Sequence, residues 1–291
     1  MGPPVAQPER FASLAAKFDP ANLRLRLLSA GLLMPLALLG IYAGSWPYVL
    51  AVMLCMAAGL HEWLAMVAKG RSRRVMIVAQ GGLLLVLGLC AWQSLAVGAA
   101  GAIVASLAIL LTAYRRGSIS ESGWGCAAWS AMGLPYLVVG GAALLALREL
   151  PEIGLALTCF LFVTVWATDI GAYAAGRLIG GPKLCPKISP KKTWAGLFGG
   201  MAFAGAFGYA VAEGFGAAQP LLAAGIGMML TLVAQIGDLF ESWVKRRFGV
   251  KDSGALIPGH GGVLDRIDGL LFAAPVFAVF QAAFGAGLRW W

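Results

Sequence analysis

The stretch Leu155-Ala-Leu-Thr-Cys-Phe-Leu-Phe-Val-Thr-Val-Trp-Ala-Thr-Asp169 decides the fold. It lies in an apolar segment, residues 152–175, that carries no charge between Glu152 and Asp169. One helix needs about 20 predominantly apolar residues to cross the hydrocarbon core of a bilayer, so this segment predicts a transmembrane helix. An ionisable side chain in hydrocarbon costs a few kcal/mol. Asp169, near the end of the span, is therefore also a candidate functional residue.

Similar apolar segments occur along the rest of the chain. The 291 residues are 60% hydrophobic and only 12% charged, whereas soluble domains carry roughly 25% charged residues. This composition predicts an all-α polytopic integral membrane protein with about nine transmembrane helices. The other expected spans are residues 27–44, 46–68, 75–92, 94–113, 124–147, 194–213, 219–239 and 270–288.

The positive charges predict the orientation of these spans. Lys and Arg are retained in cytoplasmic loops, and a cytoplasmic N-terminus places 20 of the 22 Lys and Arg residues on that side, leaving only Arg148 and Arg289 on the other. We therefore expect a multi-pass protein of the plasma (inner) membrane with its polar loops at the cytoplasmic face. The net charge of +9 is explained by topology and by anionic lipid headgroups, so no nucleic-acid partner is expected.

Polar residues divide the chain into unequal parts. We expect a cytoplasmic segment at residues 1–26, N-terminal membrane helices at 27–150 and a catalytic membrane region at 151–291. The spans of the first part are almost free of polar groups except for His61-Glu62. This pair lacks the second His of a zinc-protease motif, and it is interpreted as a polar helix end, with contact to the active site as the alternative. Small residues within the spans favour close helix packing and permit a homodimer.

The richest polar segment is residues 237–268. If the helix before it continues to Arg246, then Asp238, Glu241, Ser242 and Lys245 share one face, because they are three or four residues apart. A loop rich in Gly and Pro follows. Asp265 and Asp268 then begin the next helix, again three residues apart.

Carboxylates, cations and glycines in one segment are typical of a nucleoside triphosphate site. Mg²⁺ binds one or two carboxylates together with substrate phosphates. Lys and Arg neutralise the remaining phosphate charge, and glycines let backbone N–H groups approach phosphate oxygens. The segment therefore predicts a Mg²⁺-dependent site, with a second cation left open.

The same residues carry a resemblance to a known family. The order Ser242-x-Val-Lys-Arg246, Lys251-Asp-x-Gly254 and Pro258-x-His-Gly-Gly-Val-x-Asp-Arg-Ile-Asp268 resembles the phosphatidate cytidylyltransferase (CDP-diacylglycerol synthase) family. Asp169-Ile-Gly-Ala-Tyr173 and Ile188-Ser-Pro-Lys-Lys-Thr-Trp194 are also similar. The resemblance covers residues 166–275; Ala195, where many members have Glu or Gln, departs from it, with an effect that the sequence does not define.

The resemblance implies a reaction and a set of residues. CTP and phosphatidic acid would give CDP-diacylglycerol and pyrophosphate at the cytoplasmic face, with the lipid supplied by the membrane. Asp238 and Asp265 are the leading expected metal ligands, with Asp268 a third. The expected catalytic residues are Asp238, Lys245, His260, Asp265, Arg266 and Asp268. The expected substrate-binding residues are Asp169, Ser189, Lys191, Lys192, Thr193, Ser242, Arg246, Lys251, Asp252, Gly261 and Gly262.

Two other classes of function stay open at this point. A CTP-dependent lipid or polyprenol kinase would use the same substrates but would transfer the γ-phosphoryl group. An ion-coupled transporter would also explain acids near membrane spans, although transporters often have two similar halves, whereas the acids here lie almost entirely in the second half. Acyl-chain preference, use of dCTP and the point of lipid entry are not predicted.

Overall fold

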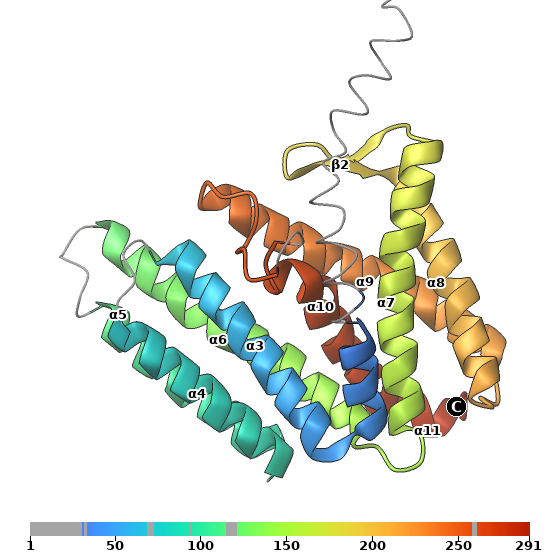
Figure 1. The fold of residues 1–291 in the computed structure, drawn as a ribbon, viewed down its shortest axis with the longest axis horizontal. Coiled ribbons are helices and arrows are strands. Elements are labelled where there is room, and N and C mark those ends of the chain that lie inside the picture. Colours follow the sequence, from blue (N-terminus) through green and yellow to red (C-terminus); the bar gives the residue numbers. More distant parts are fainter. Residues whose placement is uncertain (1–30, 32–33, 69–72, 93–94, 115–120, 258–260) are drawn as a thin grey trace, which may run out of the picture.

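A computed structural model describes residue 31 and residues 34–68, 73–92, 95–114, 121–257 and 261–291 (Figure 1). Within this part of the chain, eight helices are long and apolar enough to cross a membrane, which confirms the all-helical multi-pass architecture. They are α3 (Ser45–Val67), α4 (Arg73–Trp92), α5 (Leu95–Tyr114), α6 (Glu121–Arg148), α7 (Gly154–Leu178), α8 (Trp194–Gly214), α9 (Pro220–Arg247) and α10 (Leu264–Phe280), which continues through η1 (Gln281–Gly285) and α11 (Ala286–Leu288).

The expected span at residues 27–44 is described only in part. Its described apolar helix runs from Met34 to Ala43, and residues 27–30 and 32–33 lie outside the described residues. The structure also contains an antiparallel hairpin, β1 (Lys183–Cys185) and β2 (Ser189–Thr193), between α7 and α8. The sequence predicted only a loop there.

The helices form two groups that meet at α9 and α10. Figure 1 shows α3, α4, α5 and α6 on one side and α7 and α8 on the other, with α10 between them. α10 contacts both α6 and α7, so the two membrane regions predicted from the sequence pack against each other. Their division at residue 150 stays a prediction.

Glycines bring α7 and α8 into close contact, as the small-residue pattern predicted. A Cβ at Gly171 would lie 2.5 Å from the carbonyl oxygen of Gly199, and one at Gly200 would lie 3.0 Å from the carbonyl oxygen of Thr168. Both distances are shorter than van der Waals contact. A larger side chain at either position would therefore force these helices apart.

An aromatic cluster joins α3 to α6 and α9. Trp63 on α3 is fully buried and donates its indole N–H to the carbonyl oxygen of Trp129 on α6 at 2.8 Å. Its ring also packs against Tyr136 and Phe240. Residues 61–64 of α3 are therefore held rigidly beside α6 and α9.

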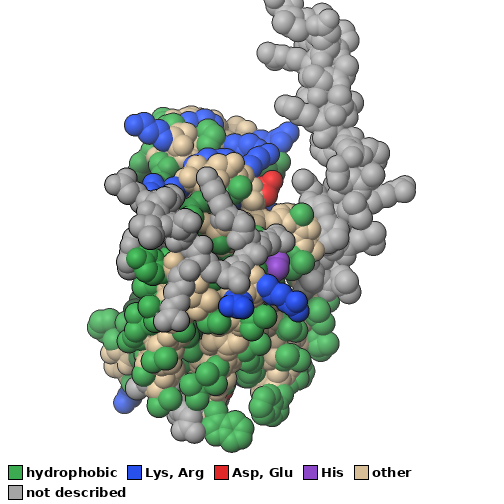
Figure 2. Space-filling view, turned by 90° about the vertical axis from the view of Figure 1, so that its left-hand side faces the viewer, with side chains coloured by type: hydrophobic (Ala, Val, Ile, Leu, Met, Phe, Trp, Pro, Cys, Tyr) green, Lys and Arg blue, Asp and Glu red, His purple; other side chains and the backbone are tan. Residues whose placement is uncertain are grey.

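Charge is distributed unequally between the two ends of the bundle. The β1–β2 hairpin lies at the upper end in Figure 1, and the turn between α6 and α7 lies at the lower end. Figure 2 shows the face on the left-hand side of Figure 1. Lys and Arg side chains gather mainly in its upper part, and hydrophobic side chains cover its lower part. This separation is the one that the positive-inside pattern predicted, while the side of the membrane stays a prediction.

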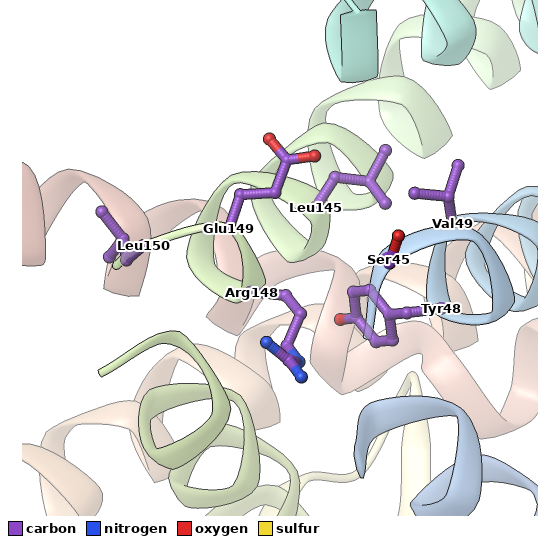
Figure 3. Close-up of a pocket in the computed structure, with 7 residues that line it drawn as sticks. All are labelled: Ser45, Tyr48, Val49, Leu145, Arg148, Glu149 and Leu150. Atoms are coloured by element: carbon purple, nitrogen blue, oxygen red, sulfur yellow. The ribbon is translucent and has the colours of Figure 1, made fainter. Parts of the chain in front are cut away.

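Arg148 fixes the lower end of the bundle. Its Nε donates to the carbonyl oxygen of Ile41 at 2.8 Å, and its Nη2 donates to that of Tyr42 at 3.3 Å. These are carbonyls of the last turn of the helix Met34–Ala43, which lack partners within the helix. Gly44, at φ 61°, leaves room for the guanidinium. Figure 3 shows Arg148 lining a pocket of about 240 Å³ with residues of α3 and α6.

Replacing Arg148 with Ala is expected to destabilise the protein by about 1.5–3 kcal/mol, the range for hydrogen bonds made by a charged group. Thermal unfolding in detergent measures the change. Glu149→Ala, an exposed neighbour, is the matched control and should unfold like the wild type. Equal unfolding temperatures for all three proteins would show that Arg148 does not anchor this end.

Candidate active site at the polar end of the bundle

The polar face predicted for α9 is present. The helix continues to Arg247. The polar residues Asp238, Glu241, Ser242 and Lys245 therefore lie along one side of it. Ser242 Oγ donates to Asp238 Oδ1 at 3.3 Å, and Lys245 forms an ion pair with Glu241. The side chain of Glu241 is fully buried. Helix geometry thus places two acids, a hydroxyl group and a cation together at the end of a membrane span.

Asp265 connects α9 to the start of α10. Its Oδ1 accepts Lys245 Nζ at 2.6 Å. Its Oδ2 accepts the backbone N–H groups of Ser253 at 3.1 Å and Gly262 at 3.0 Å. Asp265 therefore holds three groups at once: the lysine of α9 and two separate points of the loop between the two helices, Ser253 and Gly262.

Three further carboxyl groups come together from three helices. Gly237 lets α9 approach α10, since a Cβ there would lie 2.6 Å from the carbonyl oxygen of Asp268. This contact places Asp238 beside Asp268. Asp169 on α7 lies within electrostatic range of Asp238, Asp268 and Arg266. The structure thus brings together the acids that the sequence had placed in separate segments.

The hairpin contributes a cation to this cluster. Lys192 on β2 forms an ion pair with Asp238 Oδ2 at 2.6 Å and donates to Gln235 Oε1 at 2.7 Å. Thr193, expected to bind substrate, is buried, and its Oγ1 accepts the N–H of Gly196 at 3.0 Å as the N-cap of α8. Ser189 pairs with Cys185 in the hairpin, and Lys191 is exposed. Only Lys192 of this segment contacts the acids directly.

The remaining expected residues lie on or near the loop between α9 and α10. Lys251, Asp252 and Arg266 are exposed at this end, and Arg246 donates to the carbonyl oxygen of Val250 at 3.4 Å. His260 lies outside the described residues.

The two glycines expected to bind substrate already use their N–H groups. That of Gly261 donates to the carbonyl oxygen of Ile257 at 3.1 Å, and that of Gly262 donates to Asp265. In this structure they therefore shape the loop, and their contact with a phosphate stays a prediction.

Sequence reasoning underestimated Glu62. This residue of α3 is buried, and its carboxylate accepts hydrogen bonds from the loop and from the start of α10. Its signal in the sequence was a lone acid among apolar residues of a span. That signal was interpreted as a polar helix end, because nothing local links residue 62 to a segment 200 positions away.

The cluster fits a magnesium ion shared with substrate. Among the described residues, no group of three or more His, Cys, Asp and Glu is arranged to hold a metal alone. Mg²⁺ is usually held by one or two carboxylates, waters and substrate phosphates. Asp238 is partly exposed, with one partner on each oxygen, Ser242 and Lys192. Asp268 Oδ1 accepts the N–H of Gly269 at 2.7 Å. The oxygens of Asp265 are more fully engaged.

The fold and this site define a class: a multi-pass membrane protein with a cluster of acids and cations at one end of its helix bundle. Comparison with known proteins specifies the class further. A model of the cytidylyltransferase family matches residues 24–284, and the chain belongs to this family.

Individual relatives carry a more specific name. The chain is 40% identical over 275 residues to a phosphatidate cytidylyltransferase of Brucella suis, covering 91% of this chain and 95% of the relative. It is 34% identical over 286 residues to one of Pseudomonas aeruginosa, covering 91% and 99%. A relative from Staphylococcus saprophyticus is 42% identical over 155 residues, covering 53% and 58%. The resemblance inferred from the motifs is confirmed.

Proposed function

We propose that the chain transfers the cytidylyl group of CTP to phosphatidate, giving CDP-diacylglycerol and pyrophosphate. The observation that carries this conclusion is the full-length similarity to phosphatidate cytidylyltransferases. The site supports it, because the family motif and the acids of α7, α9 and α10 meet at one end of the bundle. The protein is thus a membrane nucleotidyltransferase of phospholipid synthesis.

Charge repulsion is the main obstacle to this reaction. A phosphate oxygen of phosphatidate forms a bond to the α-phosphorus of CTP, and the bond to the pyrophosphate leaving group breaks. The phosphate monoester is already an anionic nucleophile, so no activating base is required. Catalysis then rests on holding two polyanions in line and neutralising their charge. We expect the partly exposed Lys192 and the exposed Lys251 and Arg266 to contact phosphates.

The acids would hold Mg²⁺, which when bound supplies charge neutralisation at the phosphates. Asp238 and Asp268 are the ligands we favour, and binding by Asp238 requires Lys192 to give way to the metal. Asp265 was also expected to be a ligand, and that role requires Lys245 to give way. In this structure Asp265 accepts hydrogen bonds from Lys245, Ser253 and Gly262. A second cation stays an alternative.

The substrates determine where the site must lie. The acyl chains of phosphatidate stay in the bilayer, whereas CTP arrives from water, so the site belongs at the interface. The gathering of Lys and Arg at this end supports the cytoplasmic side of the plasma membrane. A homodimer is supported only by the small-residue helix faces and stays a prediction.

The position of a label in CTP tests the proposal against its nearest rival. Purified protein in detergent is supplied with phosphatidic acid, Mg²⁺ and CTP labelled at the α- or the γ-phosphate. Label from the α-phosphate alone is expected in the lipid product. Label from the γ-phosphate in lipid would indicate a kinase, and no lipid label from folded protein would contradict both enzymes.

A further inference from the structure

Glu62 of α3 makes its hydrogen bonds with the loop between α9 and α10 and with the start of α10. Its side chain is on a different helix, yet Oε1 accepts the N–H of Val263 at 3.1 Å. Its Oε2 accepts the N–H of Leu264 at 2.8 Å and the hydroxyl of Ser253 at 3.2 Å. The residue is only 3% exposed. A buried carboxylate that accepts hydrogen bonds from three donors is a specific structural contact.

These donors include the first N–H groups of α10. A helix begins with N–H groups that have no partner inside it, and Val263, the N-cap of α10, makes no side-chain cap. Glu62 supplies this cap from another helix. Its negative charge also lies at the positive end of the α10 dipole. The carboxylate thus fixes both the position and the first turn of the helix that carries Asp265 and Asp268.

The loop is shaped to fit the carboxylate. A Cβ at Gly254 would collide with Glu62 Oε1, and a Cβ at Gly262 would collide with the hydroxyl of Ser253 and lie 2.6 Å from Glu62 Oε2. The approach of Glu62 therefore accounts for Gly254, and Glu62 together with Ser253 accounts for Gly262. The hydrogen bonds from Ser253 and Val263 require this approach.

Glu62 and Asp265 share the same two loop segments. Ser253 donates its hydroxyl to Glu62 and its N–H to Asp265. On the other segment, Gly262 donates to Asp265 and Val263 donates to Glu62. The two carboxylates therefore hold the loop at Ser253 and again just before α10. Because Trp63 anchors this part of α3 to α6, the loop is fixed to a rigid part of the bundle.

We propose that Glu62 is a positioning residue for cytidylyl transfer: through Ser253 and Val263 it presets two described segments of the loop, and through Leu264 the start of α10, and so the arrangement of Asp265 and Asp268. This inference rests on the proposed function. Groups held in the productive arrangement before substrate binds contribute to rate, because less ordering is needed during the reaction. Glu62 itself does not contact the reacting groups.

The test compares Glu62→Gln with wild type, with His61→Gln as control because His61 is an exposed neighbour. Gln keeps the shape but replaces one acceptor oxygen with a donor that faces the donors of the loop. We expect kcat to fall about 10–100-fold, the range for residues that orient a metal site indirectly. The KM for CTP should change less than about 3-fold, because phosphate-binding cations remain. Glu62→Asp, which keeps the charge, should recover part of the rate.

Hydrogen–deuterium exchange without substrate provides a readout that does not depend on activity. Exchange in Glu62→Gln should rise in peptides covering residues 250–268 and stay unchanged in α4 and α5. Ser253→Ala, which removes one donor, should give a smaller rise at the same peptides.

Two results would overturn the inference: kcat of Glu62→Gln within twofold of wild type, or exchange that rises throughout the bundle while Glu62→Asp recovers nothing. If wild type transfers no cytidylyl group, the proposed function fails, whereas the exchange data still decide whether Glu62 holds the loop.

Discussion

Replacing Asp238 with Asn is expected to lower the rate of cytidylyl transfer at least about 100-fold, because one charged ligand of a catalytic metal contributes several kcal/mol to the transition state. Asn keeps the shape of the side chain and loses its charge. Asp238 lies where α9, α10 and the hairpin meet, and its pairing with Lys192 at 2.6 Å ends with this change. Because the lost charge would also weaken metal binding, we expect a higher Mg²⁺ concentration for half-maximal activity.

The measurement is the initial rate of label transfer into lipid over a range of Mg²⁺ concentrations. Glu213→Gln is the control, because Glu213 is exposed at the end of α8 away from the hairpin. Its rate should equal that of wild type. Wild-type activity and wild-type Mg²⁺ dependence in Asp238→Asn would remove Asp238 from the metal site.

Replacing Lys245 with Met is expected to destabilise the protein by about 3–5 kcal/mol, the cost of breaking a buried ion pair and leaving the acid uncompensated. Lys245 contacts both Glu241 and Asp265, and its own side chain is 11% exposed. In the described structure, no hydrogen bond other than this ion pair reaches the oxygens of Glu241. Met has a similar length, so the loss of stability reflects the missing charge more than a change in packing.

Unfolding in detergent at neutral pH measures this change. The double variant Lys245→Met/Glu241→Gln should regain part of the lost stability, because the buried charge is removed together with its partner. Lys187→Ala, at an exposed position of the hairpin turn, should unfold like wild type. If Lys245→Met is as stable as wild type, the ion pair between Lys245 and Asp265 does not hold α9 and α10 together.

Local patterns were enough to predict the helices and part of the site. The length of each apolar run fixes a span, and a spacing of three or four residues fixes a helix face. For this reason the shared face of Asp238, Glu241, Ser242 and Lys245 followed from the sequence on the condition that the helix continues to Arg246, and the helix ends at Arg247. The start of α10 near Asp265 followed from the glycines and proline before it.

Contacts between distant segments were not predictable in this way. Glu62 meets Leu264 across 202 positions, and no spacing rule relates them. The same limit explains Thr193 and Gly262, whose residue types suggest phosphate binding but whose polar groups here cap α8 and hold Asp265. A polar residue in a motif can serve the scaffold or the substrate, and only its partners distinguish the two.

The hairpin was missed because its strands are too short for an alternating pattern. β1 has three residues and β2 has five, and their polar composition is equally typical of a cytoplasmic loop. The pairing nevertheless matters for the site, because it directs Lys192 toward Asp238. The sequence had identified this lysine for its charge without predicting its partner.

The location of the nucleotide tests the account most directly. A photoactivatable CTP analogue is crosslinked to the wild-type protein in detergent with Mg²⁺ and phosphatidic acid, and the labelled peptides are identified by mass spectrometry. The account predicts label in residues 183–193 and 245–268, suppressed by excess CTP. Label that CTP suppresses but that lies at the opposite end of the bundle, around the turn between α6 and α7, would contradict it.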